Sequence, residues 1–150
     1  MEDLSTPQFD SIQPQFCINS KLRRLYKIAD GIYQKELSEF GLRGSMLPIL
    51  FEIGKNPSVS QKQIAEYLVL DQSTVSRDVR KMESKGWVVL IPSDEDSRIA
   101  EITLTRKGAL FLEEIAPVWK SIHQRVMEHL GVYNTQNIDA LINCMTHLKI

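Results

Sequence analysis

The sequence predicts a mainly helical α+β protein with one small hairpin. Apolar residues recur at helical spacing in most segments between Phe16 and Leu148. The segment Ser60–Gly86 has the signals of two short helices joined by a turn, and the strand-like segments 87–91 and 99–105 follow it. Two such helices next to a two-stranded wing form a winged helix-turn-helix. We therefore expect a winged helix-turn-helix with long flanking helices.

An arm and two helices are expected before this core. Residues 1–15 contain two prolines and no sustained period, so we expect no fold of their own there. The apolar residues of 16–40 cover about half of a helix circumference, more than one packed face requires. This helix should therefore contact a second subunit as well as its own domain. A helix over 43–54 contains Pro48, which should bend it or lie in its first turn.

The helix-turn-helix is predicted from its caps. Ser60 and Gln63 have the spacing of a capping box, so a helix should begin at Ser60. A short turn at 69–70 leads to Asp71, a good N-cap residue, and the next helix should end at Gly86.

The wing and the C-terminal helices complete the chain. The strand over 99–105 alternates, and its inward positions should be Ala100, Ile102 and Leu104. A helix over 106–130 with a kink near Pro117 should follow, and then a last helix over 135–148. Their apolar length exceeds what a small winged domain can cover, which again indicates a second subunit.

Charge placement identifies a candidate DNA-binding face. The formal net charge is only −1, and Ser60–Lys107 has eight basic and eight acidic residues. A nucleic-acid-binding protein usually has a basic excess. On a helical wheel, however, Asp78 and Glu83 lie nearer the buried side, so the exposed face is hydroxylic and cationic. That face contains Ser73, Arg77, Arg80 and Ser84, bordered by Ser76 and Lys81, with Thr74 just beyond.

These residue types suit duplex DNA. Arginine and lysine contact phosphates or guanine edges, and short hydroxyl groups reach phosphate oxygens or base edges. Arg98 near the hairpin tip suits the minor groove, and Asp96 can hold a guanidinium in position. Charged runs often form only a solvated face, but here a capped helix and a hairpin bearing an arginine accompany the face, which favours DNA binding.

The sequence resembles the MarR family of bacterial transcriptional regulators over nearly its whole length. The matching residues are Ser60-Gln61, Ile64-Ala65, Asp71-Gln72-Ser73-Thr74-Val75-Ser76-Arg77, Met82-Glu83-Ser84-Lys85-Gly86-Trp87, Asp96-Ser97-Arg98 and Leu104-Thr105-Arg106-Lys107-Gly108. The family often has a basic pair where this chain has Ser97-Arg98, and Asp94 and Glu95 make the wing tip unusually acidic.

The resemblance implies one domain over 1–150 that works as an intertwined homodimer. Residues 1–15 would be an arm, 16–40 and 106–150 dimerisation helices, and 41–105 the winged DNA-binding core. Two recognition helices would enter successive major grooves of a pseudo-palindromic operator. By resemblance, Ser73, Thr74, Ser76 and Arg77 would contact bases or phosphates, Gln61 and Lys62 would contact phosphates, and Arg98 would contact the minor groove.

The resemblance also implies a signal, either a small aromatic or phenolic ligand or the oxidation of a thiol. A cleft between the long helices and the core could use Arg23, Tyr26, Tyr33 or Trp119, although aromatic residues at helical spacing are more often core. Cys17 lies at the start of the first helix, where the helix dipole lowers a thiol pKa. The alternative is that Cys17 is a small buried apolar group.

The function predicted is therefore a sequence-specific DNA-binding transcriptional regulator, and the resemblance favours a repressor. The alternative is a winged-helix module that binds protein without binding DNA. We find no nucleophile–base pair, phosphate loop or metal-ligand spacing, so we expect no enzyme, cofactor or metal site. The chain has no apolar run of roughly 18 residues and no secretory signal pattern, so we expect a cytoplasmic protein without a membrane partner.

Overall fold

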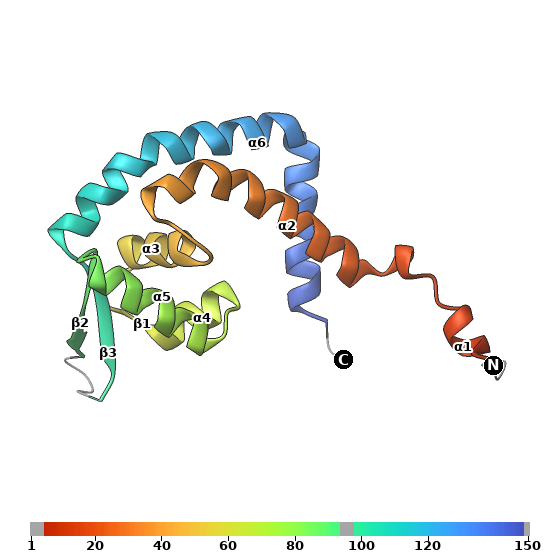
Figure 1. Ribbon diagram of the computed structural model, residues 1–150, viewed down its shortest axis with the longest axis horizontal. Helices are drawn as coiled ribbons and strands as arrows, with labels where there is room; N and C mark the ends of the chain where they lie inside the picture. The colour runs from red at the N-terminus through yellow and green to blue at the C-terminus, as the bar shows by residue number, and fades with distance from the viewer. Residues whose placement is uncertain (1–4, 94–97, 149–150) are drawn as a thin grey trace.

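The computed structural model describes residues 5–93 and 98–148. The long helices α2 and α6 lie side by side above the winged helix-turn-helix, and the N-terminal arm projects away from both (Figure 1). This arrangement is the fold class that the sequence predicts. The elements in order are α1 (Pro7–Asp10), η1 (Pro14–Phe16), α2 (Ile18–Leu37), η2 (Ser38–Phe40), α3 (Met46–Lys55), β1 (Val59–Ser60), α4 (Gln61–Leu68), α5 (Gln72–Ser84), β2 (Val88–Pro92), β3 (Ala100–Leu104) and α6 (Arg106–Thr146).

The core lies between the three small helices and the sheet. Val75, Val79 and Met82 of α5 are fully buried, as their spacing predicts. They pack with Ile49, Leu50 and Ile53 of α3 and with Ile64 of α4, which are also buried. Because one face of α5 is committed to this core, its other face is left on the surface.

The sheet has three antiparallel strands in the order β1-β3-β2, so β3 is central. Strand β1, in which Val59 pairs with Ile102, was not predicted from the sequence. A two-residue strand has no periodicity of its own and depends on its partner. Ile102 is buried, but Ala100 is exposed, contrary to our prediction. Ala100 pairs with Pro92 at the far end of the hairpin, beyond the core.

The start of α6 is fixed against the hairpin. The Thr105 hydroxyl donates to the Gly86 carbonyl at 2.6 Å and accepts a bond from the Gly108 backbone N–H at 3.0 Å. Phe111 stacks on Trp87 with ring centroids 3.9 Å apart. A Cβ atom at Gly108 would lie 1.9 Å from the Trp87 carbonyl oxygen, so the two backbones can approach this closely only at a glycine.

The sequence predicts a kink near Pro117, but the break in the last helical region lies at Gly131. Pro117 lies inside α6, and among the residues described in this helix Gly131 alone has non-helical angles, with φ 73° and ψ 161°. Beyond Gly131 the helix changes direction, and the last segment runs down across α2 in the view of Figure 1. The separate helix expected after residue 134 is this final segment. Pro48 was expected either to bend its helix or to lie in the first turn. It lies in the first turn of α3, which begins at Met46.

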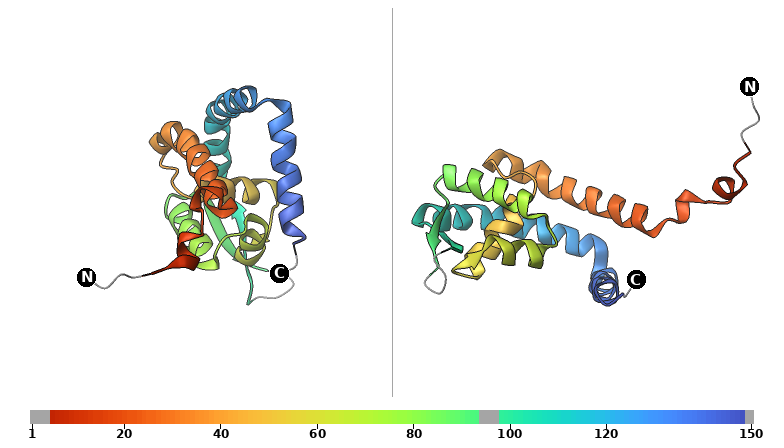
Figure 2. Two further views of the ribbon diagram at one scale, coloured as in Figure 1. Left: turned by 90° about the vertical axis from the view of Figure 1, so that its right-hand side faces the viewer. Right: turned by 90° about the horizontal axis from the view of Figure 1, so that it is seen from below.

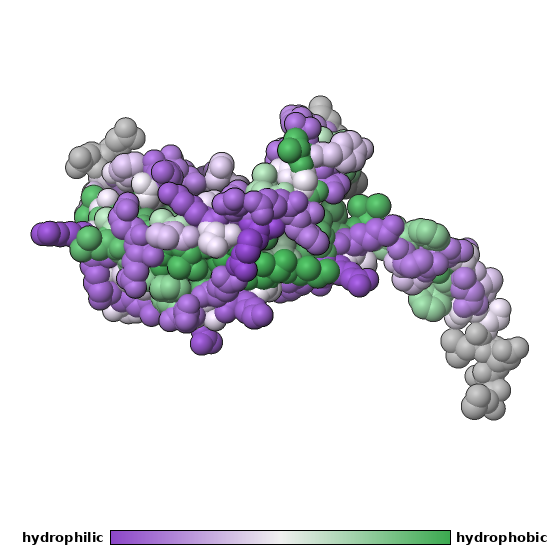
Figure 3. Space-filling view, turned by 90° about the horizontal axis from the view of Figure 1, so that it is seen from above, coloured by the Kyte–Doolittle hydropathy of each residue, from purple (hydrophilic) through white to green (hydrophobic). Residues whose placement is uncertain are grey.

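The single chain leaves large apolar surfaces uncovered. The arm contains the short helical turns α1 and η1, more local structure than we expected, and it extends away from the body in Figure 1 and in the right-hand view of Figure 2. Apolar atoms appear on the face above α2 and α6 and again on the arm (Figure 3). The large apolar residues that are exposed on α2 are Ile18, Leu22, Leu25, Tyr26, Ile28 and Ile32. In the described ranges, no helix is both long and apolar enough to cross a bilayer.

Candidate nucleic-acid interface

The capping box holds the N-terminus of α4 in place. The Gln63 backbone N–H donates to the Ser60 hydroxyl at 3.3 Å, and the Ser60 backbone N–H donates to Gln63 Oε1 at 2.9 Å. Both reciprocal bonds predicted from the sequence are therefore present. Asp71 is the N-cap residue of α5 as predicted, but its carboxylate makes no capping bond. Its backbone carbonyl instead accepts from Thr74 and Val75.

A groove collects residues from α4, α5 and the wing. It has a volume of about 580 Å³. Five of the predicted DNA-contacting residues line it: Gln61, Lys62, Ser73, Ser76 and Arg98. These residues are up to 37 positions apart in the sequence, as the numbers of Gln61 and Arg98 show. The fold thus brings hydroxyl, amide and cationic groups from three elements to one surface.

Arg77 lies along the first turns of α5. Its Nε donates to the Ser73 carbonyl and its Nη2 to the Thr74 hydroxyl, both at 3.3 Å. These bonds leave further guanidinium donors unused. Arg77 is exposed, so the residue presents a cation beside the hydroxyl groups of the same helix.

Lys81 has an acidic partner on its own helix. Its Nζ lies 2.9 Å from Oδ1 of Asp78, whose side chain is 9% exposed. The burial of Asp78 agrees with its position on the helical wheel, whereas Glu83, which was expected nearer the same side, is exposed. The Lys81 charge, which we had grouped with the DNA contacts, is therefore largely compensated within the protein. Arg80 is exposed like Lys81, but among the described residues it has no ion pair.

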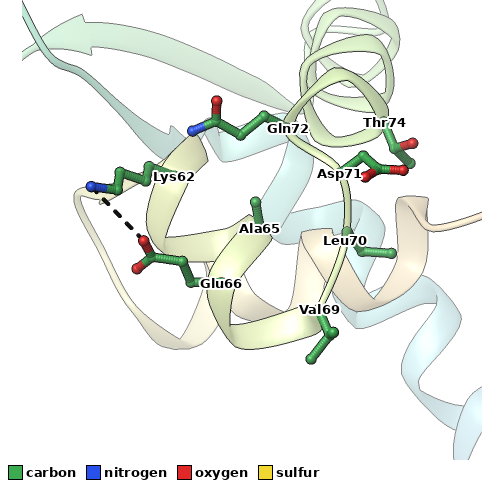
Figure 4. A pocket seen from close by; sticks show the side chains of 8 residues that line it. All are labelled: Lys62, Ala65, Glu66, Val69, Leu70, Asp71, Gln72 and Thr74. Atoms are coloured by element: carbon green, nitrogen blue, oxygen red, sulfur yellow. Dashed lines mark ion pairs between the residues drawn. The ribbon is translucent and has the colours of Figure 1, made fainter. Parts of the chain in front are cut away.

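A second pocket of about 500 Å³ lies beside the helix-turn-helix turn (Figure 4). Lys62 and Glu66 form an exposed ion pair of 3.9 Å on one wall, and Thr74 lies at the other end. Val69 is 90% exposed and has a φ of 53°, which is rare for a β-branched residue. Gln72 lines both this pocket and the groove and was not among the site residues predicted from the sequence. Its position directly after the N-cap Asp71 was the available signal.

The wing tip falls largely outside the described residues. Asp96, predicted to orient a guanidinium, is among the residues that the structure does not describe, as are Asp94, Glu95 and Ser97. Arg98 is described and exposed.

A separate cavity of about 340 Å³ lies between α2, α3 and the turn after α4. Tyr26 and Tyr33, two of the predicted effector residues, line it, and Arg23 and Trp119 do not. Arg23 is exposed. Trp119 packs edge to face on Phe51, with ring centroids 5.4 Å apart, and stacks on His123 at 4.7 Å. Asp30, which was not predicted from the sequence, lies four residues after Tyr26 on the same helix and also lines the cavity.

Tyr33 links this cavity to α6. Its hydroxyl is hydrogen bonded to Nδ1 of His123, with the two atoms 3.2 Å apart. Burial raises the pKa of the Tyr33 phenol, so the side chain is neutral near pH 7. The wall of the cavity is therefore bonded directly to the long helix.

Cys17 is exposed at the N-cap position of α2. Hydrogen bonds from Ser20, first from its hydroxyl and then from its backbone, hold the pKa of the Cys17 thiol below its ordinary value. In the single chain, the alternative of a buried apolar cysteine is wrong. Cys144 is also exposed.

Comparisons with known proteins identify similar sequences. The sequence pattern of the MarR family matches residues 40–99. The chain is 32% identical over 98 residues to YwoH of Bacillus subtilis, an uncharacterised HTH-type transcriptional regulator, covering 65% of this chain and 68% of YwoH. It is 29% identical over 94 residues to YybA of the same organism, also an uncharacterised HTH-type transcriptional regulator, covering 61% of this chain and 63% of YybA, less than two thirds.

Solved structures share the fold. BpsR of Bordetella bronchiseptica, described for the regulation of its DNA binding by 6-hydroxynicotinic acid, superposes with a TM-score of 0.80 at 20% identity, covering 92% of this chain and 99% of BpsR. A mutant MarR from E. coli complexed with operator DNA superposes with a TM-score of 0.77 at 20% identity, covering 93% of this chain and 99% of that one.

Proposed function

Because the chain belongs to the MarR family of transcriptional regulators, we propose that it binds a pseudo-palindromic operator as a homodimer and represses transcription until a small ligand releases it. The chain is a DNA-binding regulator and not an enzyme. Repression, the dimer, the ligand and the individual DNA contacts are the parts that we propose.

The observation that carries the proposal is the groove between α4, α5 and the wing. Five residues selected for their DNA-contacting chemistry converge there. We propose that Gln61 and Lys62 contact phosphates, that Ser73, Thr74, Ser76 and Arg77 contact bases or phosphates, that Arg80 contacts phosphates, and that Arg98 contacts the minor groove. The buried position of Asp78 supports this assignment because it removes an acidic group from the outer face.

The uncovered apolar residues support the homodimer. A groove of about 590 Å³ between α2 and α6 includes Leu25, Ile28, Ile32 and Ile138 in its lining. Leu141, Ile142, Met145 and Leu148 are exposed on the final segment. Soluble monomers rarely expose so many large apolar side chains in one region, so a second copy of the chain is the natural cover.

The cavity lined by Tyr26 and Tyr33 supports release by a ligand. Leu68 and Leu70, on either side of the turn that leads into α5, also line it. An occupant would therefore touch both a long flanking helix and the entry to the recognition helix. A ligand that fits one position of the turn better than another shifts the population of DNA-binding states. Oxidation of Cys17 is the alternative signal, supported by its exposure and lowered pKa.

Selection of bound fragments from genomic DNA tests the proposal. The full chain should enrich a pseudo-palindrome with half-sites about one helical turn apart. Its affinity for that fragment should fall steeply as salt rises, because phosphate contacts release counterions. Arg77→Ala should weaken binding by about 1–3 kcal/mol and broaden sequence preference. No enriched sequence, or affinity that is insensitive to salt, would contradict the proposal and favour a module that binds protein.

A further inference from the structure

Among the described residues, the cavity lined by Tyr26 and Tyr33 has one charged residue in its lining, and the sign of that charge indicates the class of ligand. This inference rests on the proposed release by a ligand. The cavity volume of about 340 Å³ is at the lower end of the range for small-molecule sites, roughly 300–1,000 Å³. It suits a compact ligand of one or two rings.

Asp30 is the one charged side chain among the described residues that line this cavity. Most of the other lining residues are apolar, including Leu37, Leu42, Leu47 and Pro48. Asp30 is partly buried. Across the described ranges, it has neither an ion pair nor a side-chain hydrogen bond. A ligand that covered this partly exposed carboxylate would remove its water, and a cationic group on the ligand would offset that cost.

The two tyrosines make the wall suitable for a cation. Tyr26 already interacts with a cation, because Lys27 Nζ lies 5.6 Å from the centroid of its ring. The Tyr33 hydroxyl is hydrogen bonded to His123, and burial raises the pKa of this uncharged phenol above its ordinary value. Lys27 itself does not line the cavity, and no described residue of the lining carries a positive charge that would bind an acid.

We infer that the effector is a compact organic cation, an aromatic amine whose ammonium group pairs with Asp30 while its ring packs against Tyr26 and Tyr33. An aromatic carboxylate of the same size would place its negative charge in a cavity whose lining has Asp30 and no cationic side chain. The expected ligand therefore has the opposite charge to a phenolic acid.

Three probes of nearly equal size separate charge from shape. Naphthylmethylammonium is a cation near pH 7, naphthoate is an anion and naphthylmethanol is neutral. Binding of each to the full chain is measured by isothermal titration calorimetry without DNA. We expect the cation to bind about tenfold more tightly than the anion, and the neutral probe to lie between them.

Matched variants test the role of Asp30. Asp30→Asn should weaken the cation by about tenfold and leave the neutral probe within about twofold. Glu39→Gln is the control, because it removes the same charge from an exposed residue that does not line the cavity. Glu39→Gln should bind every probe like the unmodified chain. Tyr26→Leu should weaken both the cation and the neutral probe, because it removes the aromatic wall.

Three results would overturn the inference: naphthoate binding as tightly as the cation, unchanged cation affinity in Asp30→Asn, or no binding of any probe. DNA affinity of each preparation is measured separately, which also shows that each variant is folded. Salt-sensitive DNA binding with failed probe binding would overturn only the ligand class. If the unmodified chain does not bind DNA, that result would instead overturn the proposed function.

Discussion

At the scale of single residues, two lysines near the recognition surface differ in whether their charge is already compensated. Lys81 is paired at 2.9 Å with the buried Asp78. Lys62 is 3.9 Å from Glu66, and both of those side chains are mostly exposed, at 73% and 66%. Solvent screening makes the second pair weak, so Lys62 is free to exchange its partner for a phosphate. The pair of Lys81 is less easily broken, because separation leaves a buried carboxylate alone.

This difference predicts unequal effects on DNA binding. Lys62→Ala should reduce the slope of log affinity against log salt by about 1, as expected for the loss of one phosphate contact. Lys81→Ala should change that slope by much less. Fluorescence anisotropy with a mixed-sequence duplex at several salt concentrations measures both. Equal slopes for the two variants would show that the ion pair with Asp78 does not prevent Lys81 from contacting a phosphate.

Cys17 should react as an activated thiol. Its pKa is lowered by Ser20, so more of it is thiolate at neutral pH than of an ordinary cysteine. Alkylation of Cys17 by iodoacetamide should rise with pH through a midpoint below the ordinary cysteine value, and Ser20→Ala should move that midpoint upward. Cys144 is exposed and provides the internal comparison, resolved by peptide mass spectrometry. A midpoint that Ser20→Ala leaves in place would refute the hydrogen-bond cause.

At the scale of elements, the junction between the wing and α6 depends on one glycine. Gly108→Ala should lower the free energy of unfolding by about 3 kcal/mol, because its Cβ would overlap the Trp87 carbonyl oxygen. Gly31→Ala in α2 is the matched control, since no atom lies within 4 Å of its Cβ position. That control should stabilise the helix by up to about 1 kcal/mol. Urea unfolding measures both, and a Gly108→Ala protein as stable as the unmodified chain would contradict the close approach.

The elements that could be predicted from sequence are those with a local signal. The α4 cap follows from Ser60 and Gln63, and the buried face of α5 follows from Val75, Val79 and Met82, because these patterns depend only on neighbours in the chain. Strand β1 and the break at Gly131 were missed. The strand exists only because β3 lies beside it. Gly131 is a single residue with positive φ, whereas Pro117 gave the stronger local signal for a kink.

The residue types of the candidate site could be predicted from the sequence, but which residues come together in one groove could not. Residue type and helical phase identified Ser73, Ser76 and Arg77 as a polar face. They could not show that Arg98 would join Ser73 and Ser76 in one groove, because that depends on how the hairpin of β2 and β3 is placed against α5, which β2 contacts. The same limit applies to Asp30, which looks like any surface acid in the sequence. Only the fold places it in a cavity with Tyr26 and Tyr33.

At the scale of the whole molecule, the long helices present apolar residues that the single chain leaves exposed. Ile28 on α2 is 56% exposed, and Ile142 on the final segment of α6 is 61% exposed. Substituting a residue that is already solvated changes the stability of a monomer little. If a second copy covers these residues, the same substitutions place a charge inside an interface, which is strongly unfavourable.

Ile28→Glu and Ile142→Glu should therefore convert a dimer into monomers, measured by sedimentation equilibrium. Leu110→Glu is the control, because Leu110 is equally exposed, at 62%, but lies at the start of α6 beside the wing. It should remain dimeric. The monomeric variants should also lose operator affinity, since one recognition helix alone forfeits the second half-site. Dimers that persist in both glutamate variants would contradict the proposed interface, and monomers that keep full operator affinity would separate dimerisation from DNA binding.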